Sequence, residues 1–262
     1  MTALPTLFLS HGSPDIVLRE TPARAFLEGL AGTLPRPRAI LVATAHFLTA
    51  EPGVAATRAP ETIYDFGGFP DELYDMTYPA AGDPELGHAI AARLEAAGLP
   101  ARVSDRRGLD HGTWIPLRLA WPAADVPVLQ LAIQPRLGPD HHLALGRAIE
   151  GLRHEGILVV GSGAMTHNLR AAWSMMSVPA ETPVPWVDEF ADWIGERVWD
   201  GAVDELLTYR ERAPHAVENH PTDEHLLPLF VALGAAGEGA RGTVLHESRD
   251  YGALRMDAIA FS

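Results

Sequence analysis

The 262-residue chain contains no cysteine. This absence excludes disulfide bonds, thiolate metal ligands and cysteine nucleophiles, so any bound metal must be held by histidine, aspartate or glutamate. The chain also lacks an uninterrupted apolar run of the ~18 residues that a membrane span requires. Its first residues, MTALPTLFLSHG, have neither the basic flank nor the small-residue cleavage site of a signal peptide. We therefore expect a soluble cytoplasmic protein with no membrane partner.

Clusters of basic residues are also absent from the sequence. The formal net charge is -14 at pH 7, with 20 Lys and Arg residues against 34 Asp and Glu residues. Affinity for nucleic acid comes largely from clustered cations that neutralise phosphates. The composition therefore predicts no nucleic-acid partner. With 47% hydrophobic residues, the chain is able to bury a sizeable core.

Short apolar runs alternate with stretches of helical period along the chain. Buried strands are indicated for residues 6–10, 39–45, 126–133 and 156–162, and amphipathic helices for residues 83–98, 140–156 and 184–207. The tail, residues 251–262, alternates like a last strand, antiparallel at an edge of the sheet. We see no internal repeat or linker. The pattern predicts one α/β domain over residues 1–262, with a central, largely parallel or mixed sheet flanked by helices.

One long segment, residues 51–84, breaks this alternation. It is rich in proline and glycine and contains the aromatic string YDFGGFPDELYDMTY, residues 64–78. Disordered segments are poor in aromatic residues, so this segment is expected to be ordered. Two interpretations stay open: a surface loop that packs only on itself, and a loop that covers a ligand site.

Three histidines stand at the ends of predicted strands. His11 directly follows the strand 6–10, His46 ends the strand 39–45, and His167 follows the strand 156–162 after a turn that contains glycine. Ligands of parallel sheets bind outside the carboxyl ends of the strands. Each histidine alone would be an ordinary hydrogen-bonded residue at a strand end, but three at one sheet edge favour a binding site.

Two further histidines are candidates for the same site. We expect His225 in the first turn of an apolar helix capped by Thr222, where the helix N-terminus favours the neutral, metal-binding imidazole. We expect His111 in a turn between Asp110 and Gly112. Neutral imidazoles from distant segments that meet in one pocket suit Zn(II) or Fe(II). Four histidines in helical segments are instead expected at the surface: His88, His141, His142 and His154.

Seven strings resemble, in order and over nearly the whole chain, the 4,5-DOPA extradiol dioxygenase group of the class III, LigB-type ring-cleaving dioxygenases. The strings are FLSHGSP, ATAHF, DFGGFPDELYDMTYPAAGDP, GLDHGTWIPL, VPVLQLAI, GSGAMTHNL and PTDEHLLPLFVALGAAG. The resemblance implies a LigB-like fold. It also implies an enzyme that opens a catechol ring beside the two hydroxyl groups and inserts both atoms of O2.

The same resemblance implies roles for individual histidines. His11, His46 and His225 match the three metal ligands of the family, although protocatechuate-type relatives carry glutamate at the third place. His167 matches the acid/base histidine, with a role as fourth ligand left open. His111 matches a second pocket histidine that would hydrogen-bond substrate or O2. The family's chemistry requires Fe(II), whereas members of this branch often hold Zn(II).

Two other functions stay open at this stage. Three histidine ligands and an open position would also serve a zinc hydrolase that uses metal-activated water. A non-catalytic metal-binding protein on the same scaffold is the other alternative. The string GSG at 161–163 lacks the spacing of a G-x-S-x-G nucleophile elbow, and no phosphate-binding loop or H-E-x-x-H helix occurs. His220 is a candidate for a residue that contacts the metal ligands without binding the metal itself.

Overall fold

A central β-sheet organises the computed structural model, which describes residues 3–179 and 182–262. Its strands are β1 (Thr6–Ser10), β2 (Ala39–Leu48), β3 (Gly53–Ala55), β4 (Arg102–Ser104), β5 (Val128–Ile133), β6 (Ile157–Gly163), β7 (Gly242–His246) and β10 (Ala258–Phe261). Within the described residues they form one eight-stranded sheet in the order β4-β3-β5-β2-β6-β1-β10-β7. The four central strands, β5, β2, β6 and β1, are parallel to their neighbours in this group. The mixed α/β sheet expected from the sequence is therefore confirmed.

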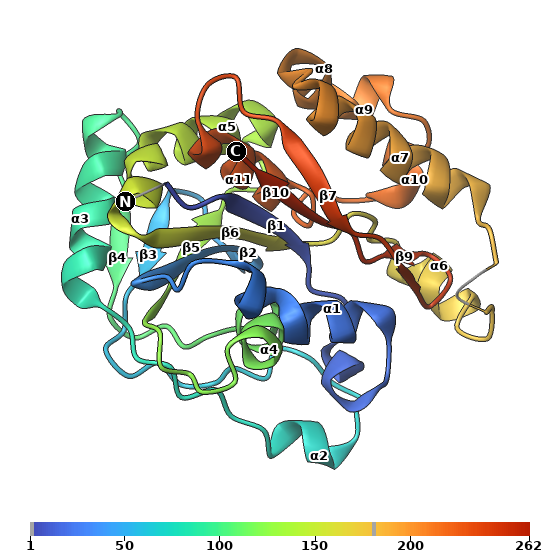
Figure 1. Cartoon of the computed structure of the whole chain (residues 1–262), viewed down its shortest axis with the longest axis horizontal. Helices are drawn as coiled ribbons and strands as arrows, with labels where there is room; N and C mark the ends of the chain where they lie inside the picture. The colour runs from blue at the N-terminus through green and yellow to red at the C-terminus, as the bar shows by residue number, and fades with distance from the viewer. Residues whose placement is uncertain (1–2, 180–181) are drawn as a thin grey trace.

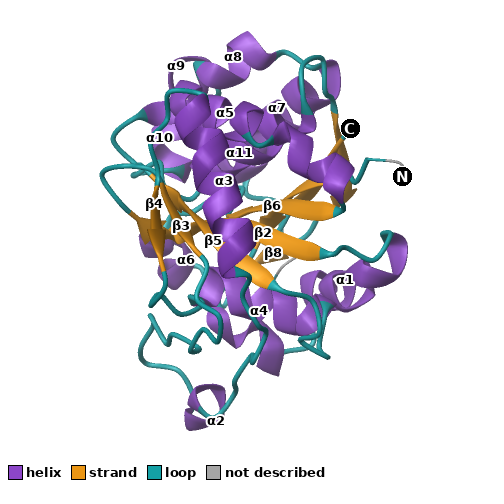
Figure 2. Cartoon of the chain, turned by 90° about the vertical axis from the view of Figure 1, so that its left-hand side faces the viewer, coloured by secondary structure: helices purple, strands orange, loops and turns teal. Residues whose placement is uncertain are grey.

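The helices cover both faces of this sheet (Figures 1 and 2). They are α1 (Pro22–Leu30), α2 (Asp71–Tyr74), α3 (Pro84–Ala96), α4 (His111–Ala120), α5 (Gly138–Ala148), α6 (Leu169–Ser174), α7 (Pro185–Asp200), α8 (Val203–Leu207), α9 (Tyr209–Arg212), α10 (Ala216–Asn219) and α11 (Leu227–Ala236). Helices α3, α5, α7 and α11 pack on one face, and α1 and α4 on the other. No helix in the described part of the chain is both long and apolar enough to cross a membrane.

Two hydrophobic cores form because successive side chains of a strand point to opposite faces of the sheet. In β1, Leu7 and Leu9 pack in the core under α1 and α4, whereas Phe8 packs in the core under α11. In β6, Leu158 packs in the core under α1 and α4, and Val159 packs in the core under α11. Each fully buried side chain of this kind contributes ~1.5–3 kcal/mol. The buried central strands hold the carboxyl edge of the sheet, where the candidate site lies, in a fixed register.

Several boundaries predicted from the sequence are wrong. The final strand is antiparallel as expected, but it pairs with both β1 and β7, so β7 and not the tail forms the edge. The helix expected over 140–156 ends at Ala148 and continues as a 3₁₀ turn over Glu150–Glu155. The helix expected over 184–207 is interrupted at Gly201, whose left-handed φ of 70° ends α7.

The segment 51–84 is less irregular than expected, because it contains β3 and the single-turn helix α2. His142 is also not a surface residue. It is fully buried, with Nε2 accepting a hydrogen bond from the backbone N–H of Gln134 at 3.1 Å. Its Nδ1 lies 2.6 Å from the carbonyl oxygen of Gly138 and therefore carries the proton. His88 and His154 are exposed, as expected.

Candidate active site

Histidines from five separate segments line one cavity of about 500 Å³ at the carboxyl edge of the parallel strands. His11 follows β1, His46 lies near the end of β2, and His167 follows β6. His111 and His225 enter from the start of α4 and from the turn before α11. A larger groove of about 940 Å³ runs along β3 and β4, but its described lining contains no histidine. The histidine-lined cavity is therefore the candidate site.

Three Nε2 atoms crowd together in this cavity. Nε2 of His46 lies 3.1 Å from Nε2 of His11 and 3.3 Å from Nε2 of His225. Nitrogen ligands held about 2.0–2.1 Å from one tetrahedral metal ion are about 3.3 Å apart. The spacing of these nitrogens therefore fits a shared divalent transition metal ion.

Hydrogen bonds on the far side of two rings set their tautomers. Ser162 donates its hydroxyl hydrogen to the carbonyl oxygen of Gly112. Its oxygen must therefore accept from Nδ1–H of His11, which lies 3.0 Å away. Nδ1 of His225 lies 3.1 Å from a carboxylate oxygen of Glu224. Both rings then present the Nε2 lone pair to the cluster, as the outer contacts of metal-binding histidines do.

The cluster favours neutral imidazoles. Burial, and then the charges of neighbouring histidines, hold the pKa values of His11 and His225 well below the usual value. Burial and the nearby His111 lower the pKa of His46 to about 3. Neutral imidazole is the form that binds a metal ion. The donor set is therefore ready for a metal at neutral pH without first losing protons.

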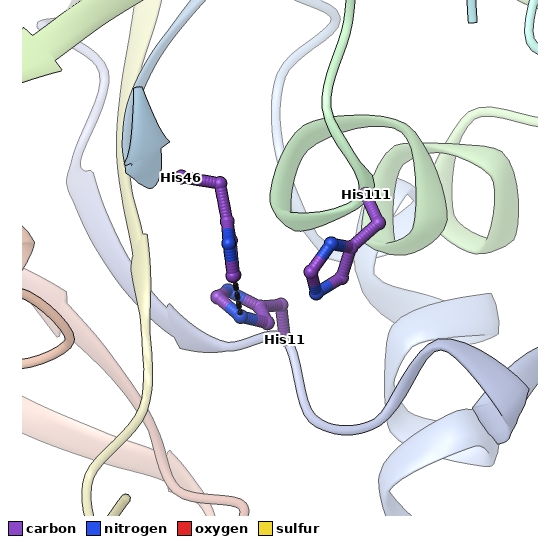
Figure 3. A group of neighbouring side chains, drawn as sticks. All are labelled: His11, His46 and His111. Atoms are coloured by element: carbon purple, nitrogen blue, oxygen red, sulfur yellow. Dashed lines mark hydrogen bonds between the residues drawn. The ribbon is translucent and has the colours of Figure 1, made fainter. Parts of the chain in front are cut away.

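His111 faces the cluster from the start of α4 (Figure 3). It is the first residue of that helix, preceded by the N-cap Asp110, and not a turn residue as expected from the sequence. One nitrogen from each of His11, His46 and His111 lies within 4.8 Å of the others. His111 is thus a fourth imidazole beside His11 and His46, and its ring centroid lies 3.9 Å from that of His46.

Asp65 contacts two histidines of the cluster, His111 and His46. One of its carboxylate oxygens accepts the backbone N–H of His111 at 2.9 Å and lies 3.0 Å from Nδ1 of that ring. The other oxygen lies 3.5 Å from Nδ1 of His46. Burial would raise the pKa of Asp65, but the side chain and backbone N–H of His111 outweigh it and lower the pKa to about 2. Asp65 is therefore an ionised partner for both rings.

His225 does not lie inside a helix. Helix α11 begins at Leu227, where Pro228 favours the first turn, and Thr222 donates its hydroxyl to Glu224 instead of capping the helix. The carbonyl oxygen of His225 accepts from the backbone N–H of Ala164 at 2.9 Å. The neutral state of this ring therefore results from burial, and the expected helix cap is wrong.

Two glycines let the histidine segments approach closely. A Cβ at Gly163 on β6 would collide with the carbonyl oxygen of His225. A Cβ at Gly112 would lie 2.9 Å from the ring of His46 and 3.3 Å from the ring of His11. Both positions lack space for any side chain, so these residues must be glycine for the histidines to pack as they do.

His167 lines the cavity beside this cluster. Its ring stacks on that of His225, with ring centroids 3.4 Å apart and an interplanar angle of 10°. Burial and the nearby His220 lower the pKa of His167 to about 3. His220 itself is fully buried behind the site, and its Nε2 donates to the carbonyl oxygen of Met165 at 2.8 Å. His167 is therefore a neutral base that faces the same space as the three Nε2 atoms.

Part of the aromatic segment 64–78 covers the cavity. Phe66 and Phe69 line it, and the ring of Phe66 meets that of His111 edge to face at 5.6 Å between centroids. Tyr64 and Tyr78 turn away and donate their hydroxyls to backbone carbonyl oxygens. The loop therefore does not pack only on itself: Phe66 and Phe69 face the cavity, and Tyr64 and Tyr78 anchor the loop.

Sequence reasoning missed three residues that hold the histidines. Asp65 was visible only as part of an aromatic-rich string, and Ser162 only as the centre of a GSG that failed a nucleophile pattern. Glu224 directly precedes His225, but the sequence does not indicate that its carboxylate reaches Nδ1 of that ring. Adjacency in sequence was a signal only for Glu224, because the contacts of Asp65 and Ser162 with histidines join distant segments.

Comparison with known proteins agrees with this geometry. The family model described as the catalytic LigB subunit of aromatic ring-opening dioxygenase matches residues 7–258. A protein of Beta vulgaris named 4,5-DOPA dioxygenase extradiol is 39% identical over 262 residues, covering 98% of this chain and 96% of the relative. A protein of the same name from Escherichia coli K12 is 39% identical over 263 residues, covering 98% and 94%.

A solved structure supports the same assignment. It is that of an uncharacterized protein from Escherichia coli K12, with a TM-score of 0.81 and 33% sequence identity, covering 98% of this chain and 99% of the other. The resemblance seen in the sequence is therefore confirmed over nearly the full length of both proteins. The chain belongs to the LigB family of aromatic ring-opening dioxygenases.

Proposed function

We propose that the chain, over residues 1–262, is a metal-dependent extradiol dioxygenase that opens a catechol-type ring beside its two hydroxyl groups with both atoms of O2. One observation carries this proposal: Nε2 of His46 lies within 3.3 Å of Nε2 of both His11 and His225. The names of the relatives in Beta vulgaris and Escherichia coli support the reaction class.

His11, His46 and His225 are the proposed metal ligands. Fe(II) bound there would supply the redox chemistry that ring opening by O2 requires. Zn(II) suits the same three nitrogens and is the expected competitor. Ser162 and Glu224 would keep the Nε2 lone pairs of two ligands turned toward the ion through their bonds to Nδ1.

His167 is the proposed acid/base group. It lines the cavity, and burial, which lowers its pKa to about 3, keeps the ring neutral at pH 7, so that one ring nitrogen has a free lone pair for the proton of a catechol hydroxyl. The resulting imidazolium lies in a buried position that favours return of the proton to a ring-opened oxygen. Its stacking on His225 keeps the ring beside the ligands without requiring it to be one.

His111 is the proposed second pocket histidine. Asp65 accepts its backbone N–H and lies beside its Nδ1, which fixes the ring at the start of α4. From there the ring can hydrogen-bond a substrate oxygen. Phe66 and Phe69 would shield the aromatic ring of the substrate from water.

Oxygen uptake tests the proposal. The protein is prepared metal-free, reconstituted anaerobically with Fe(II) or with Zn(II), and mixed with a panel of catechols in an oxygen electrode. We expect O2 uptake that depends on the catechol with Fe(II) and not with Zn(II). A zinc hydrolase would instead show turnover without O2 consumption, and a non-catalytic metal-binding protein would show neither.

A further inference from the structure

The histidine cavity continues outward along helix α6, which forms part of its wall. Leu169 and Trp173 of α6 and Met176 in the turn after it line the cavity, and their exposed fractions are 43%, 70% and 58%. Helix α6 is anchored in the protein, because Ala172 is buried in an apolar cluster that also contains Leu254. Large apolar side chains grouped at the mouth of a cavity indicate a surface that is covered when a ligand binds.

Positive charge is absent from the described lining of this cavity. The chain has no lysine, and none of its arginines is among the lining residues. Arg19 lies behind the wall, with its guanidinium 4.4 Å from the ring centroid of Tyr251, and is paired with Asp15 and Asp250. Arg107 is paired with Asp110. The described wall therefore contains no lysine or arginine that could form an ion pair with a carboxylate on a substrate.

Asp65 is the one carboxylate among the described lining residues. Its two oxygens face His111 and His46, at the inner end of the cavity. It therefore repels an anionic substituent, and its existing partners leave it poorly placed to bind an ammonium group near α6. The net charge of -14 adds a long-range repulsion of anions.

We infer that this cavity selects catechols whose ring substituent is uncharged and apolar, and that it disfavours catechols with a carboxylate or amino-acid side chain. The substituent would lie between Phe69 of the loop, Trp173 of α6 and Met176 in the turn that follows α6. This inference rests on the proposed function for the position of the catechol hydroxyls at the histidines. It predicts a preference different from the substrate in the names of the relatives from Beta vulgaris and Escherichia coli.

Anaerobic binding tests the preference without turnover. The Zn(II)-loaded protein is titrated calorimetrically with 4-propylcatechol, 3,4-dihydroxyphenylpropionate and L-DOPA, which place a neutral, an anionic and a zwitterionic group at similar reach. We expect 4-propylcatechol to bind at least tenfold more tightly than the other two. Along the series from methyl to butyl, each added methylene should tighten binding by up to about fourfold.

Substitutions in α6 and in the turn after it locate the selecting surface. The measured quantity is the affinity for 4-propylcatechol divided by the affinity for unsubstituted catechol. Trp173→Ala should lower this ratio by about fivefold or more, since the substituent loses its apolar wall. Trp199→Ala, which removes a tryptophan 61% exposed on α7 and outside the cavity lining, is the matched control and should leave this ratio unchanged. Met176→Arg should reverse the preference toward 3,4-dihydroxyphenylpropionate by adding the missing cation.

Three results would overturn the inference. The first is equal or tighter binding of 3,4-dihydroxyphenylpropionate or L-DOPA by the unmodified protein. The second is an unchanged affinity ratio in Trp173→Ala. The third is a change of oligomeric state in Trp173→Ala, by light scattering, without any change of the ratio, because the apolar face would then serve a second copy of the chain. Loss of O2 uptake with every catechol would count against the proposed function alone, since these binding ratios do not depend on turnover.

Discussion

The hydroxyl of Ser162 donates to the carbonyl oxygen of Gly112, so Nδ1 of His11, 3.0 Å from the same hydroxyl, is the donor in their hydrogen bond. Ser162→Ala removes the group that fixes this tautomer. We expect metal affinity to fall by about 10- to 100-fold, the range found for outer partners of metal-binding histidines. Competition with a chelator, read by elemental analysis, measures it.

Thr6→Val is the matched control for that substitution. Thr6 is also buried in the sheet, on β1, and donates its hydroxyl to the carbonyl oxygen of Ala232, away from the cavity. It should lower the stability of the fold by about 1 kcal/mol, as loss of a buried hydrogen bond does, and leave metal affinity unchanged. An equal loss of metal affinity in both variants would attribute the effect to general destabilisation and contradict the role of Ser162.

The identity of the third ligand can be tested by comparing His225→Ala with His111→Ala. Nε2 of His225 lies 3.3 Å from Nε2 of His46, whereas Nδ1 of His111 lies 3.0 Å from a carboxylate oxygen of Asp65. We expect the purified His225→Ala protein to hold little metal and the His111→Ala protein to hold most of it. Metal loss in His111→Ala as complete as in His225→Ala would place His111 among the ligands.

The strand-end position of three histidines could be predicted from the sequence because apolar strands are easy to recognise and parallel strands share a carboxyl edge. His11, His46 and His167 all reach the cavity for this reason. The start of α11 was harder to predict, because Thr222 is a good N-cap by type but Pro228 and a turn at Asp223 set the boundary. The packing of this turn against β6, and not the capping propensity of Thr222, therefore sets where the helix begins.

Contacts between distant segments could not be predicted from the sequence. Asp65 and His111 are 46 residues apart, and His11 and Ser162 are 151 residues apart. His142 has the helical spacing of a surface residue, yet it is buried, because Gln134 and Gly138 use both of its nitrogens. In each case the side chain's role is set by a partner that only the folded chain provides.

His167 and His11 should differ when each is replaced by alanine. His11→Ala removes one of three ligands and should lose both metal and activity. His167→Ala should keep most of the metal and lose about 100- to 10,000-fold in ring-cleavage rate, the contribution of a positioned proton-transfer group. Elemental analysis of the folded proteins and initial rates separate the two effects. Equal metal loss in both variants would make His167 a ligand and pass proton transfer to His111 or water.

Stability should fall as the pH is lowered from about 6.5 toward 4, in part through His142. Burial lowers the pKa of His142 to about 4. Between this pH and about 6.5, His142 is therefore protonated in the unfolded chain but not in the folded protein. This contribution is fully present above the unfolded pKa and is lost as the pH falls, by up to about 1.4 kcal/mol per pH unit.

Urea unfolding of metal-free protein across this pH range measures the slope. His142→Gln should lower overall stability, since Gln134 loses its acceptor, and should flatten the dependence on pH. His88→Gln, an exposed position on α3, is the control and should leave the slope unchanged. An unchanged slope in His142→Gln would contradict the assignment of the acid sensitivity to this residue.

Mass balance of a single reaction tests the central claim most directly. The Fe(II)-reconstituted protein is given 4-propylcatechol in air-saturated buffer, and the consumed O2, the hydrogen peroxide formed and the exact mass of the product are measured together. We expect one O2 consumed for each catechol, no peroxide, and a ring-opened product heavier than the substrate by the mass of one O2. A product lighter by two hydrogens, formed with peroxide, or no O2 uptake with any catechol, would contradict the assignment of this histidine cluster to extradiol ring cleavage.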